Sequence, residues 1–381
     1  MLDHTKLYNN LMNLCTDPVH EDAFYYQDFT SDDKIYRIFN YRLVNWTTFQ
    51  NAIDAKKCRG TMFEISNEPV LASLPPDKFF NYAEGDVNHC NFSGEILVHE
   101  KLDGSLISTY MHNGEMRLKS KGSINSSQAI EAMLWLELPE NSELKQNMIN
   151  ILKEQECTIN LEWTGPQNRI VVGYESADLR VLSINIHDDG HTILKQNHIN
   201  LPFTKQISLD EYCADLEEEN MHSMVNKMYN ETTGEGYVIS FLYDSDLQYQ
   251  VKVKNHTYCN LHKIKDSISS PEALAELIIR GGVDDVYDLF ADDIHTINLI
   301  EDMENKVVPI FNHMVSDTEK FYFANRHLTR KEYAIKARTE VPILMPLLMN
   351  LYIEREINYE DFAVRNMNTI FGVKNVNKQY K

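Results

Sequence analysis

Lysines recur at short spacings in a chain whose formal net charge is −21. They are Lys101, directly before an Asp-Gly pair in KLDGS, then Lys119 and Lys121 in KSKGS, and Lys252 and Lys254 in VKVK. Alternate residues of a strand share a face, so each Lys-x-Lys pair predicts two ammonium groups side by side. Like charges repel, so such pairs are unfavourable unless an anion binds there. The alternatives are solvated strand faces and, for KLDGS, a hairpin turn beside an exposed lysine. Three clusters in one part of the chain favour an anion-binding site.

The elements that must position these lysines are predicted to be short strands. Segments rich in β-branched and aromatic residues, bounded by Gly, Asn, Asp or Pro, recur up to about residue 262. They cover residues 34–41, 60–65, 95–102, 106–112, 158–164, 169–174, 180–187, 236–243 and 249–254. Helices are predicted over 126–138, with Ser126 or Ser127 as the N-cap, and over 215–230. Few helices without regular βαβ alternation indicate an α+β fold with antiparallel sheets rather than a Rossmann-type fold.

The pattern changes after residue 265. Helical periodicity covers residues 270–282, 283–314, 329–338, 341–356 and 359–371. The first of these segments begins Ser-Pro-Glu and ends at a Gly pair, as helices commonly do. We therefore expect two domains, residues 1–262 and an all-α domain of residues 263–381.

Composition excludes several classes of protein. An excess of acidic residues is unlike a protein that coats nucleic acid nonspecifically. The six cysteines lack CxxC spacing and the histidines lack an HExxH motif, so no zinc site is indicated. No GxxxxGK[ST] motif occurs, and neither a signal peptide nor an apolar stretch long enough for a membrane span is present. We expect a soluble cytoplasmic protein without a membrane partner.

KLDGS resembles the nucleotidyl-lysine motif of the covalent nucleotidyltransferases, which comprise DNA ligases, RNA ligases and mRNA capping enzymes. The other motifs of that superfamily follow in order: NLEWTG with Glu162, GEGYVI with Glu235, and VKVK. YRIFNY, CRGTMFEI, DKFFN, KSKGSI, NRIVVGY and the helical DDVYDLFADD narrow the resemblance to the bacteriophage RNA ligase 1 family, whose members repair tRNA. The resemblance implies a nucleotidyltransferase domain with an ATP-grasp-like antiparallel sheet, followed by an all-α RNA-specificity domain.

The resemblance also implies an ATP-dependent reaction in three steps. Lys101 attacks the α-phosphorus of ATP and forms lysyl-AMP, AMP passes to an RNA 5′-phosphate, and an RNA 3′-hydroxyl displaces AMP. A free lysine, with a pKa of about 10.4, is a poor nucleophile at neutral pH. Lys252, Lys254 and a magnesium ion would favour its neutral form, because nearby cations disfavour the ammonium.

The roles of further residues follow from the same resemblance. Glu162 is expected to accept a hydrogen bond from the AMP ribose, and Glu235 to hold Mg²⁺ directly or through water. Lys252 and Lys254 are expected to contact the α-phosphate. The rest of the expected ATP-binding set is Tyr41, Arg59, Lys78, Phe80, Gly104, Lys119, Lys121 and Tyr258. In this set Arg59 and Lys78 would hold the departing pyrophosphate, and Gly104, with Asp103, would shape the turn that presents Lys101.

Some of these positions have simpler alternatives. The aromatic residues of the set could be core residues, and Arg59 could form an ion pair with Glu64 on a strand. Leu102 is expected to point away from the lysine. Asp284, next to Asp285, is a candidate second metal ligand by resemblance, although adjacent aspartates near a helix N-terminus are commonly just solvated.

The expected partner is RNA, in particular a broken tRNA. A basic segment of the helical region, Arg326, Arg330, Lys331, Lys336 and Arg338, is either an RNA contact or a solvated helix face. A DNA ligase or capping enzyme is the alternative, but those usually continue into a β-rich OB-fold after VKVK. A second alternative is a catalytically silent RNA-binding relative. The intact set of lysines and carboxylates argues against this alternative. The absence of coiled-coil heptads favours a monomer, in the host cytoplasm if a phage encodes it.

Overall fold

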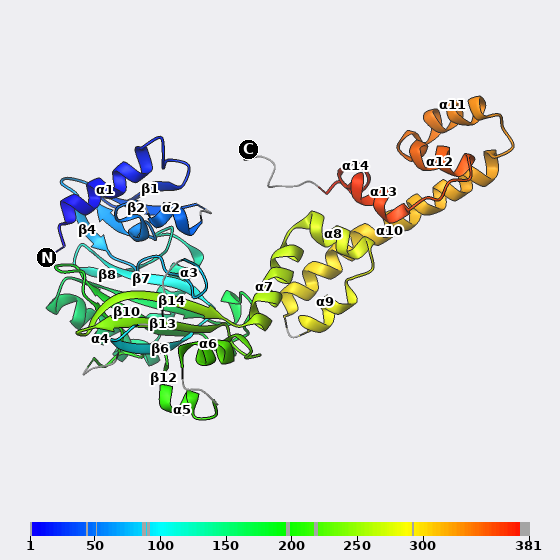
Figure 1. Cartoon of the computed structure of the whole chain (residues 1–381). Helices are drawn as coiled ribbons and strands as arrows, with labels where there is room; N and C mark the ends of the chain where they lie inside the picture. Colours follow the sequence, from blue (N-terminus) through cyan, green and yellow to red (C-terminus); the bar gives the residue numbers. More distant parts are fainter. Residues whose placement is uncertain are drawn as a thin grey trace. The chain divides into compact units, whose positions relative to one another are not determined.

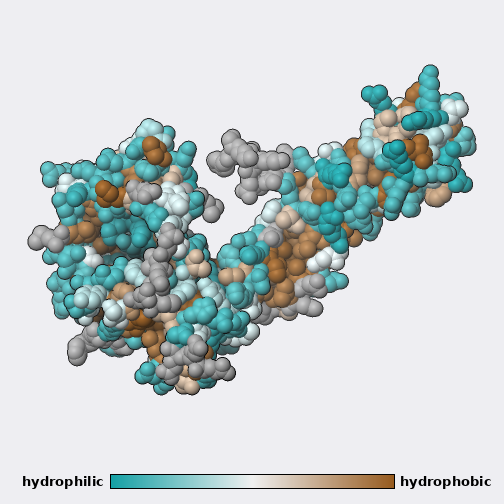
Figure 2. All heavy atoms as spheres, viewed as in Figure 1, coloured by the Kyte–Doolittle hydropathy of each residue, from teal (hydrophilic) through white to brown (hydrophobic). Residues whose placement is uncertain are grey.

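The structure is a computed structural model that describes residues 2–42, 45–50, 52–85, 89, 92–195, 199–216, 220–291 and 293–373. The chain forms two compact units, Met1–Cys259 and Asn260–Lys381 (Figure 1). The first unit is mixed α and β with largely antiparallel sheets, and the second is helical, which confirms the predicted fold class. Figure 2 shows hydrophilic residues over most of the visible surface of each unit. None of the helices in the described part of the chain is long and apolar enough to cross a membrane.

The first unit begins with a helix that packs on a small antiparallel sheet. The sheet has the order β1-β2-β3-β4, from β1 (Phe24–Ser31), β2 (Lys34–Tyr41), β3 (Met62–Glu64) and β4 (Val70–Ser73). Helix α1 (His4–Thr16) is capped by the Asp3 side chain. Its buried leucines, Leu7, Leu11 and Leu14, join the core formed by the sheet, the short helix α2 (Trp46–Gln50) and the 3-10 helix η1 (Ala55–Lys57).

Two five-stranded sheets form the rest of this unit. One has the order β11-β10-β9-β7-β8, from β7 (Ser105–His112), β8 (Glu115–Ser120), β9 (Cys157–Thr164), β10 (Asp178–Ile186) and β11 (Thr192–Ile193). The other has the order β12-β6-β13-β14-β5, from β5 (Phe80–Asn81), β6 (Glu95–Lys101), β12 (Gln206–Ile207), β13 (Gly236–Tyr243) and β14 (Asp246–Lys254). All pairs in both sheets are antiparallel except β5 with β14. The connection from β6 to β7 carries the Asp-Gly pair, so the hairpin-like turn links the two sheets.

Helices cover the outer faces of these sheets. α3 (Ser127–Leu136) and α4 (Ser142–Glu154), with η3 (Pro139–Asn141) between them, pack on the first sheet, and η4 (Pro166–Asn168) follows β9. Ser126 is the N-cap of α3, one of the two predicted positions. The helix predicted over 215–230 is shorter: α5 (Leu209–Cys213) precedes it, α6 (Met221–Tyr229) forms its second part, and residues 217–219 lie outside the described residues.

One predicted strand is wrong. Residues 169–174, which read as β-branched strand, form an irregular segment instead. The backbone N–H groups of Val171 and Val172 both donate to Asp103 Oδ2, each at 2.7 Å. Because these two N–H groups donate to a buried carboxylate, they cannot donate to a neighbouring strand. The contact with Asp103 therefore overrides the β-strand propensity of the segment.

The second unit is built around one long helix. It contains α8 (Pro271–Ile279), α9 (Asp284–Leu289), α10 (Ile294–Asn325), α11 (Arg330–Glu340), η5 (Pro342–Leu344), α12 (Met345–Tyr352), α13 (Tyr359–Arg365) and α14 (Met367–Phe371). α7 (His256–Ser269) contains the boundary between the units. In α10, buried Ile300, Val307, Met314 and Phe321 recur every seven residues and form a stripe within the core of the unit. α10 passes through Pro309 without ending.

Candidate active site

The centre of the site is a carboxylate between two lysines. Glu235 Oε2 lies 2.7 Å from Lys101 Nζ, and Glu235 Oε1 lies 2.7 Å from Lys254 Nζ. The Glu235 side chain is only 3% exposed, whereas the lysines are 21% and 26% exposed. The buried carboxylate therefore binds both amines, while both lysines remain partly exposed and line the pocket.

Strand register explains this arrangement. In the central strand β13, Gly236 is the register partner of Lys101 on β6 and of Lys254 on β14. Two positions further along, Val238 is the partner of His99 and of Lys252. One face of three adjacent strands thus carries His99, Lys101, Lys252 and Lys254, and all four line one pocket. The expectation that Lys252 and Lys254 share a face is confirmed.

Gly236 is required at this position. Its φ is +139°, a backbone conformation that residues with a Cβ rarely adopt. An added Cβ would lie 2.0 Å from the Val253 carbonyl oxygen. The glycine thus keeps β13 close to β14, where Glu235 reaches both amines.

Four further cations gather at one end of the pocket. Arg59, Lys78 and Lys252 line it, and Lys121 Nζ lies 4.5 Å from the centroid of the Tyr41 ring, which also lines it. Lys78 Nζ lies 5.4 Å from the same ring. None of these four cations forms an ion pair with a carboxylate among the residues that the structure describes. In a chain of net charge −21, this cluster of cations is a candidate binding site for an anion.

The pKa values of these cations reflect their crowding. Burial, followed by the charges of Lys78, Lys254 and Lys101, lowers the pKa of Lys252 to about 8. Burial also lowers the pKa of Lys78, Lys121 and the half-buried Arg59, and neighbouring cations lower it further for both lysines. The simpler alternative, an ion pair between Arg59 and Glu64, is wrong. Arg59 Nη1 donates to the Pro76 carbonyl at 3.2 Å, whereas Glu64 pairs with Lys34.

Glu162 lies on the other sheet and faces the same pocket. Its Oε1 accepts a hydrogen bond of 3.1 Å from the backbone N–H of Gly104. Burial raises the pKa of Glu162 to about 7, although the charges of Lys101 and Arg59 oppose this rise. An added Cβ at Gly104 would lie 2.3 Å from the Trp163 carbonyl oxygen, so glycine permits the close approach of the turn to β9.

Asp103 fixes the turn after Lys101. The residue is 1% exposed. Besides the two amides of the 169–174 segment, its Oδ1 accepts a 2.6 Å hydrogen bond from the Tyr258 hydroxyl. The Tyr258 ring lies 4.9 Å from Lys254 Nζ, measured to the ring centroid. Tyr258 is therefore a buried residue that links the turn to the lysine strand, not a residue that lines the pocket.

Lys119 and Phe80 are also buried and are not among the residues that line the pocket. Lys119 is fully buried, and its Nζ donates to the Ser120 carbonyl at 3.1 Å. Burial lowers the pKa of this amine to about 7. Phe80 belongs to the core and packs edge-on against Phe49, with Lys78 Nζ 5.2 Å from its ring centroid.

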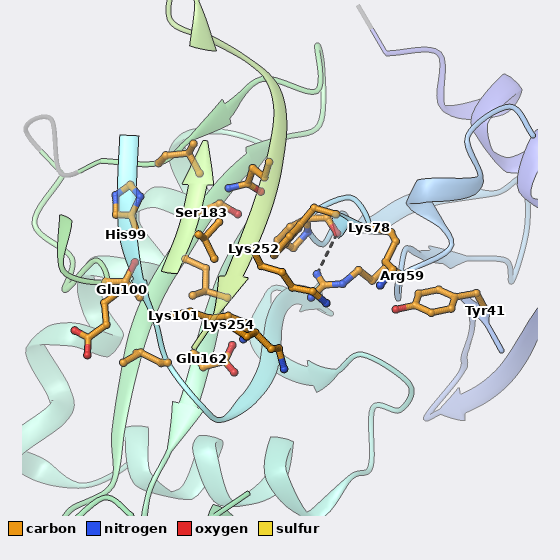
Figure 3. A pocket seen from close by; sticks show the side chains of 18 residues that line it. Tyr41, Arg59, Lys78, His99, Glu100, Lys101, Glu162, Ser183, Lys252 and Lys254 are labelled. Carbon is orange, nitrogen blue, oxygen red and sulfur yellow. Dashed lines mark hydrogen bonds between the residues drawn. The ribbon is translucent and has the colours of Figure 1, made fainter. Parts of the chain in front are cut away.

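Several lining residues were not predicted. Figure 3 shows Tyr41 and Arg59 at one end of the pocket and His99 and Ser183 at the other, with the lysines between them. The pocket lining also includes Leu182, Leu194, Thr204, Val238 and Gln250. His99 and Gln250 stand two residues before a predicted lysine, so strand alternation would have found them. Leu102, expected to point away, in fact lines this pocket as well.

The Asp284 candidate lies in the second unit. Asp284 begins α9 with an exposed side chain, and the Asp285 side chain is outside the described part of the structure. Within the described residues, no three His, Cys, Asp or Glu side chains gather as metal ligands would. The Asp284 metal site stays a prediction.

Comparisons with known proteins agree with this fold and these motifs. The family model described as RNA ligase matches residues 57–258, and the model described as T4 RNA ligase 1, C-terminal domain, matches residues 265–380. The first match alone spans more than half of the chain. The chain therefore belongs to the T4 RNA ligase 1 family, which confirms the resemblance drawn from its motifs.

Two curated proteins are similar over part of their length. One, from Autographa californica nuclear polyhedrosis virus, is named as a bifunctional polynucleotide kinase/RNA ligase and is 28% identical over 278 residues, 68% of this chain and 38% of that protein. RNA ligase 1 of bacteriophage TS2126 is 28% identical over 155 residues, 39% of each chain. The chain thus spans about two fifths of the length of these relatives.

Solved structures are similar at lower identity. A mutant of Naegleria gruberi RNA ligase with ATP and Mn is 13% identical, with a TM-score of 0.33, and the match covers 45% of this chain and 52% of that one. An archaeal ATP-dependent RNA ligase is 12% identical, with a TM-score of 0.42, over 78% of this chain and 76% of that one. The family membership rests on the sequence-family models.

Proposed function

We propose that the protein is an ATP-dependent RNA ligase that joins a 5′-phosphate to a 3′-hydroxyl through lysyl-AMP and RNA-adenylate. The observation that carries the proposal is the Glu235 carboxylate held between Lys101 and Lys254, beside four cations that form no ion pair with any carboxylate in the described part of the chain. A binding module has no need of an amine paired to a buried carboxylate and aimed at an anion site. Membership of the RNA ligase family supports RNA as the substrate.

ATP fits the pocket in one direction. Its triphosphate suits the cationic end at Arg59, Lys78 and Lys252, because phosphate oxygens replace the carboxylates that these cations lack. Its base suits the neutral end, where burial lowers the pKa of His99 to about 4 and keeps the ring uncharged. Lys101 then stands between the two ends, where the α-phosphorus would lie.

The first step forms the Lys101 Nζ–phosphorus bond and breaks the bond from the α-phosphorus to the bridging oxygen of pyrophosphate. The amine must lose protons, and Glu235 Oε2, at 2.7 Å, is the nearest acceptor. Arg59 and Lys78 would stabilise the charge on departing pyrophosphate. In the second step an RNA 5′-phosphate oxygen displaces Lys101, which regains its proton. In the third, an RNA 3′-hydroxyl attacks the 5′-phosphate and AMP leaves.

A magnesium ion fits the donor set at Glu235. Mg²⁺ is commonly held by one or two carboxylates, with waters and substrate phosphates completing its shell, so Glu235 would be an adequate protein ligand. When bound, the ion would neutralise negative charge on the phosphates of ATP. Glu162, whose protonated and ionised forms both exist near neutral pH, suits a hydrogen bond with the ribose.

The decisive experiment uses ATP labelled at its α-phosphorus. The proposal requires an acid-labile protein–AMP adduct that forms with ATP and a divalent cation. Lys101→Ala should abolish the adduct yet still permit joining of pre-adenylylated RNA, and Lys153→Ala, at an exposed position on α4, should change neither. Labelling by GTP in place of ATP, or an adduct that survives Lys101→Ala, would refute the proposal.

The RNA that we propose as the natural substrate is a broken tRNA. The basic segment supports an RNA contact in the second unit: Arg326, Arg330, Lys331 and Arg338 are exposed on or beside α11. Glu332, the carboxylate within the segment, is engaged by Thr329 in a capping box. The segment is therefore a local excess of positive charge on an acidic protein, which suits the phosphates of a folded RNA.

A further inference from the structure

A row of buried polar side chains crosses three strands beside the neutral end of the pocket. Ser108 on β7, Asn160 on β9, and Ser183 and Asn185 on β10 are between 0% and 5% exposed. Ser183 lines the pocket, while Asn160 and Asn185 stand behind it. Burying polar groups is costly unless their hydrogen bonds are made, so such a row implies fixed orientations.

The hydrogen bonds of Asn160 determine which way its amide faces. Asn160 Nδ2 lies 3.3 Å from the Leu74 carbonyl oxygen, which can only accept, so this atom must be the nitrogen. Its Oδ1 therefore faces Ser108 Oγ, 2.7 Å away. The same Nδ2 lies 3.2 Å from Ser183 Oγ, so Asn160 donates its second proton to the Ser183 hydroxyl.

The Ser183 proton also has a partner. Ser183 Oγ donates to Asn185 Oδ1 at 2.9 Å. A hydroxyl has one proton and two lone pairs. With the proton directed to Asn185 and one lone pair used by Asn160, the remaining capacity of Ser183 is one lone pair.

A β-bulge in β10 directs the Ser183 side chain toward the pocket. Val181 pairs with Leu161 and Ser183 pairs with Asn160, so Leu182 is an extra residue on β10. Bulges often re-aim side chains next to active sites. Here both Leu182 and Ser183 line the pocket, although consecutive strand residues would normally face opposite sides.

Gln250 also lines the pocket, and its Nε2 donates to Ser240 Oγ at 2.9 Å. An amide nitrogen carries two protons, so Gln250 keeps one N–H as well as the lone pairs of its Oε1 and can meet either kind of group on a base. The side chain at this site whose polarity is fixed by its neighbours is Ser183, which has only a lone pair left to offer.

We propose that Ser183 selects the nucleotide by accepting a hydrogen bond from the exocyclic 6-amino group of adenine, with Asn160 and Asn185 as positioning residues that fix its polarity. A base with a keto oxygen at this position would set acceptor against acceptor. This inference rests on the proposed function, because it requires the base of ATP to lie at the neutral end.

The test compares nucleotides in the full-length protein, with adduct formation followed by intact-protein mass. The nucleotides are ATP, purine riboside triphosphate, which lacks the 6-amino group, and ITP, which carries a keto oxygen. The ratio of kcat/KM for ATP to that for purine riboside triphosphate measures use of the amino group and does not depend on the folded fraction. Ser183→Ala should lower this ratio roughly threefold to tenfold, the factor for one neutral hydrogen bond.

Two variants serve as controls. Ser183→Thr keeps the hydroxyl and should keep the wild-type ratio. Ser73→Ala removes an equally buried serine, whose hydroxyl donates to the Thr109 carbonyl outside the pocket, and should also leave the ratio unchanged. An unchanged ratio in Ser183→Ala would overturn the inference, as would wild-type preference for ITP over purine riboside triphosphate, since that would require a donor rather than an acceptor beside the 6-position of the base. Absence of any adduct in the wild-type protein would instead count against the ligase proposal itself.

Discussion

Replacing Lys119 by methionine is expected to stabilise the protein and to remove part of its pH dependence between pH 7 and pH 9. Lys119 is fully buried on β8, and its amine has the Ser120 carbonyl, 3.1 Å away, as its hydrogen-bond acceptor among the described residues. Burial lowers its pKa from 10.5 to about 7. Methionine has a similar length and no charge, so it should fill the same space.

The sign and size of the effect follow from proton binding. Between pH 7 and pH 10.5 the unfolded chain binds more protons at this lysine than the native state does, so stability rises with pH. A shift from 10.5 to about 7 makes this rise roughly 2 kcal/mol between pH 7 and pH 9. At pH 7 the buried amine costs about 4 kcal/mol, which sets the upper limit of the gain from Lys119→Met.

Urea unfolding at pH 7, 8 and 9 measures both quantities. Lys252 also has a lowered pKa and shifts stability in the same direction, so the informative quantity is the difference between the variant and the wild type. Lys153→Met, at an exposed position on α4, should leave the wild-type pH profile unchanged. A Lys119→Met profile parallel to that of the wild type would refute the reasoning, because it would mean that Lys119 titrates alike in both states.

Three further predictions concern the site and the second unit. Glu235→Gln removes the charge shared by two lysines and should slow single-turnover adduct formation roughly 100-fold or more, with normal thermal unfolding as the check on folding. Asp103→Ala removes the acceptor of three hydrogen bonds and should cost about 2–4 kcal/mol in urea unfolding, whereas Tyr258→Phe, which removes one of them, should cost less. Neutralising the five positions of the basic segment should lower sealing of tRNA more than sealing of a short linear RNA and should flatten the salt dependence of RNA binding. Equal losses for the two RNAs would contradict a role in selecting tRNA.

The parts of the site that follow strand alternation were predictable. Lys252 and Lys254 share a face because they are two residues apart on one strand, and the same rule applied to His99 and Gln250 would have extended the set. The sequence also predicts a β-rich region followed by a helical region, since the hydrophobic periodicity changes after residue 265.

Other features depend on contacts between distant segments. The 169–174 segment has strand-like residues, but its amides bind Asp103, about 70 positions earlier. Helix α1 was not predicted because its leucines are spaced among polar residues and are buried only once the small sheet is present. The bulge at Leu182 leaves no mark in the sequence, so strand alternation alone would have put either Leu182 or Ser183 in the pocket, but not both.

The position of the reactive amine depends on a register that no single motif encodes. Lys101 ends β6, Lys254 ends β14, and Glu235 immediately precedes β13, which runs between them. Only when Gly236 is opposite both lysines does the carboxylate reach the two amines, each at 2.7 Å. A slip of one residue in either pairing would turn the corresponding lysine to the other face of the sheet. The three motifs are far apart in the sequence, and strand pairing brings them together, because each motif supplies the end of one of three neighbouring strands.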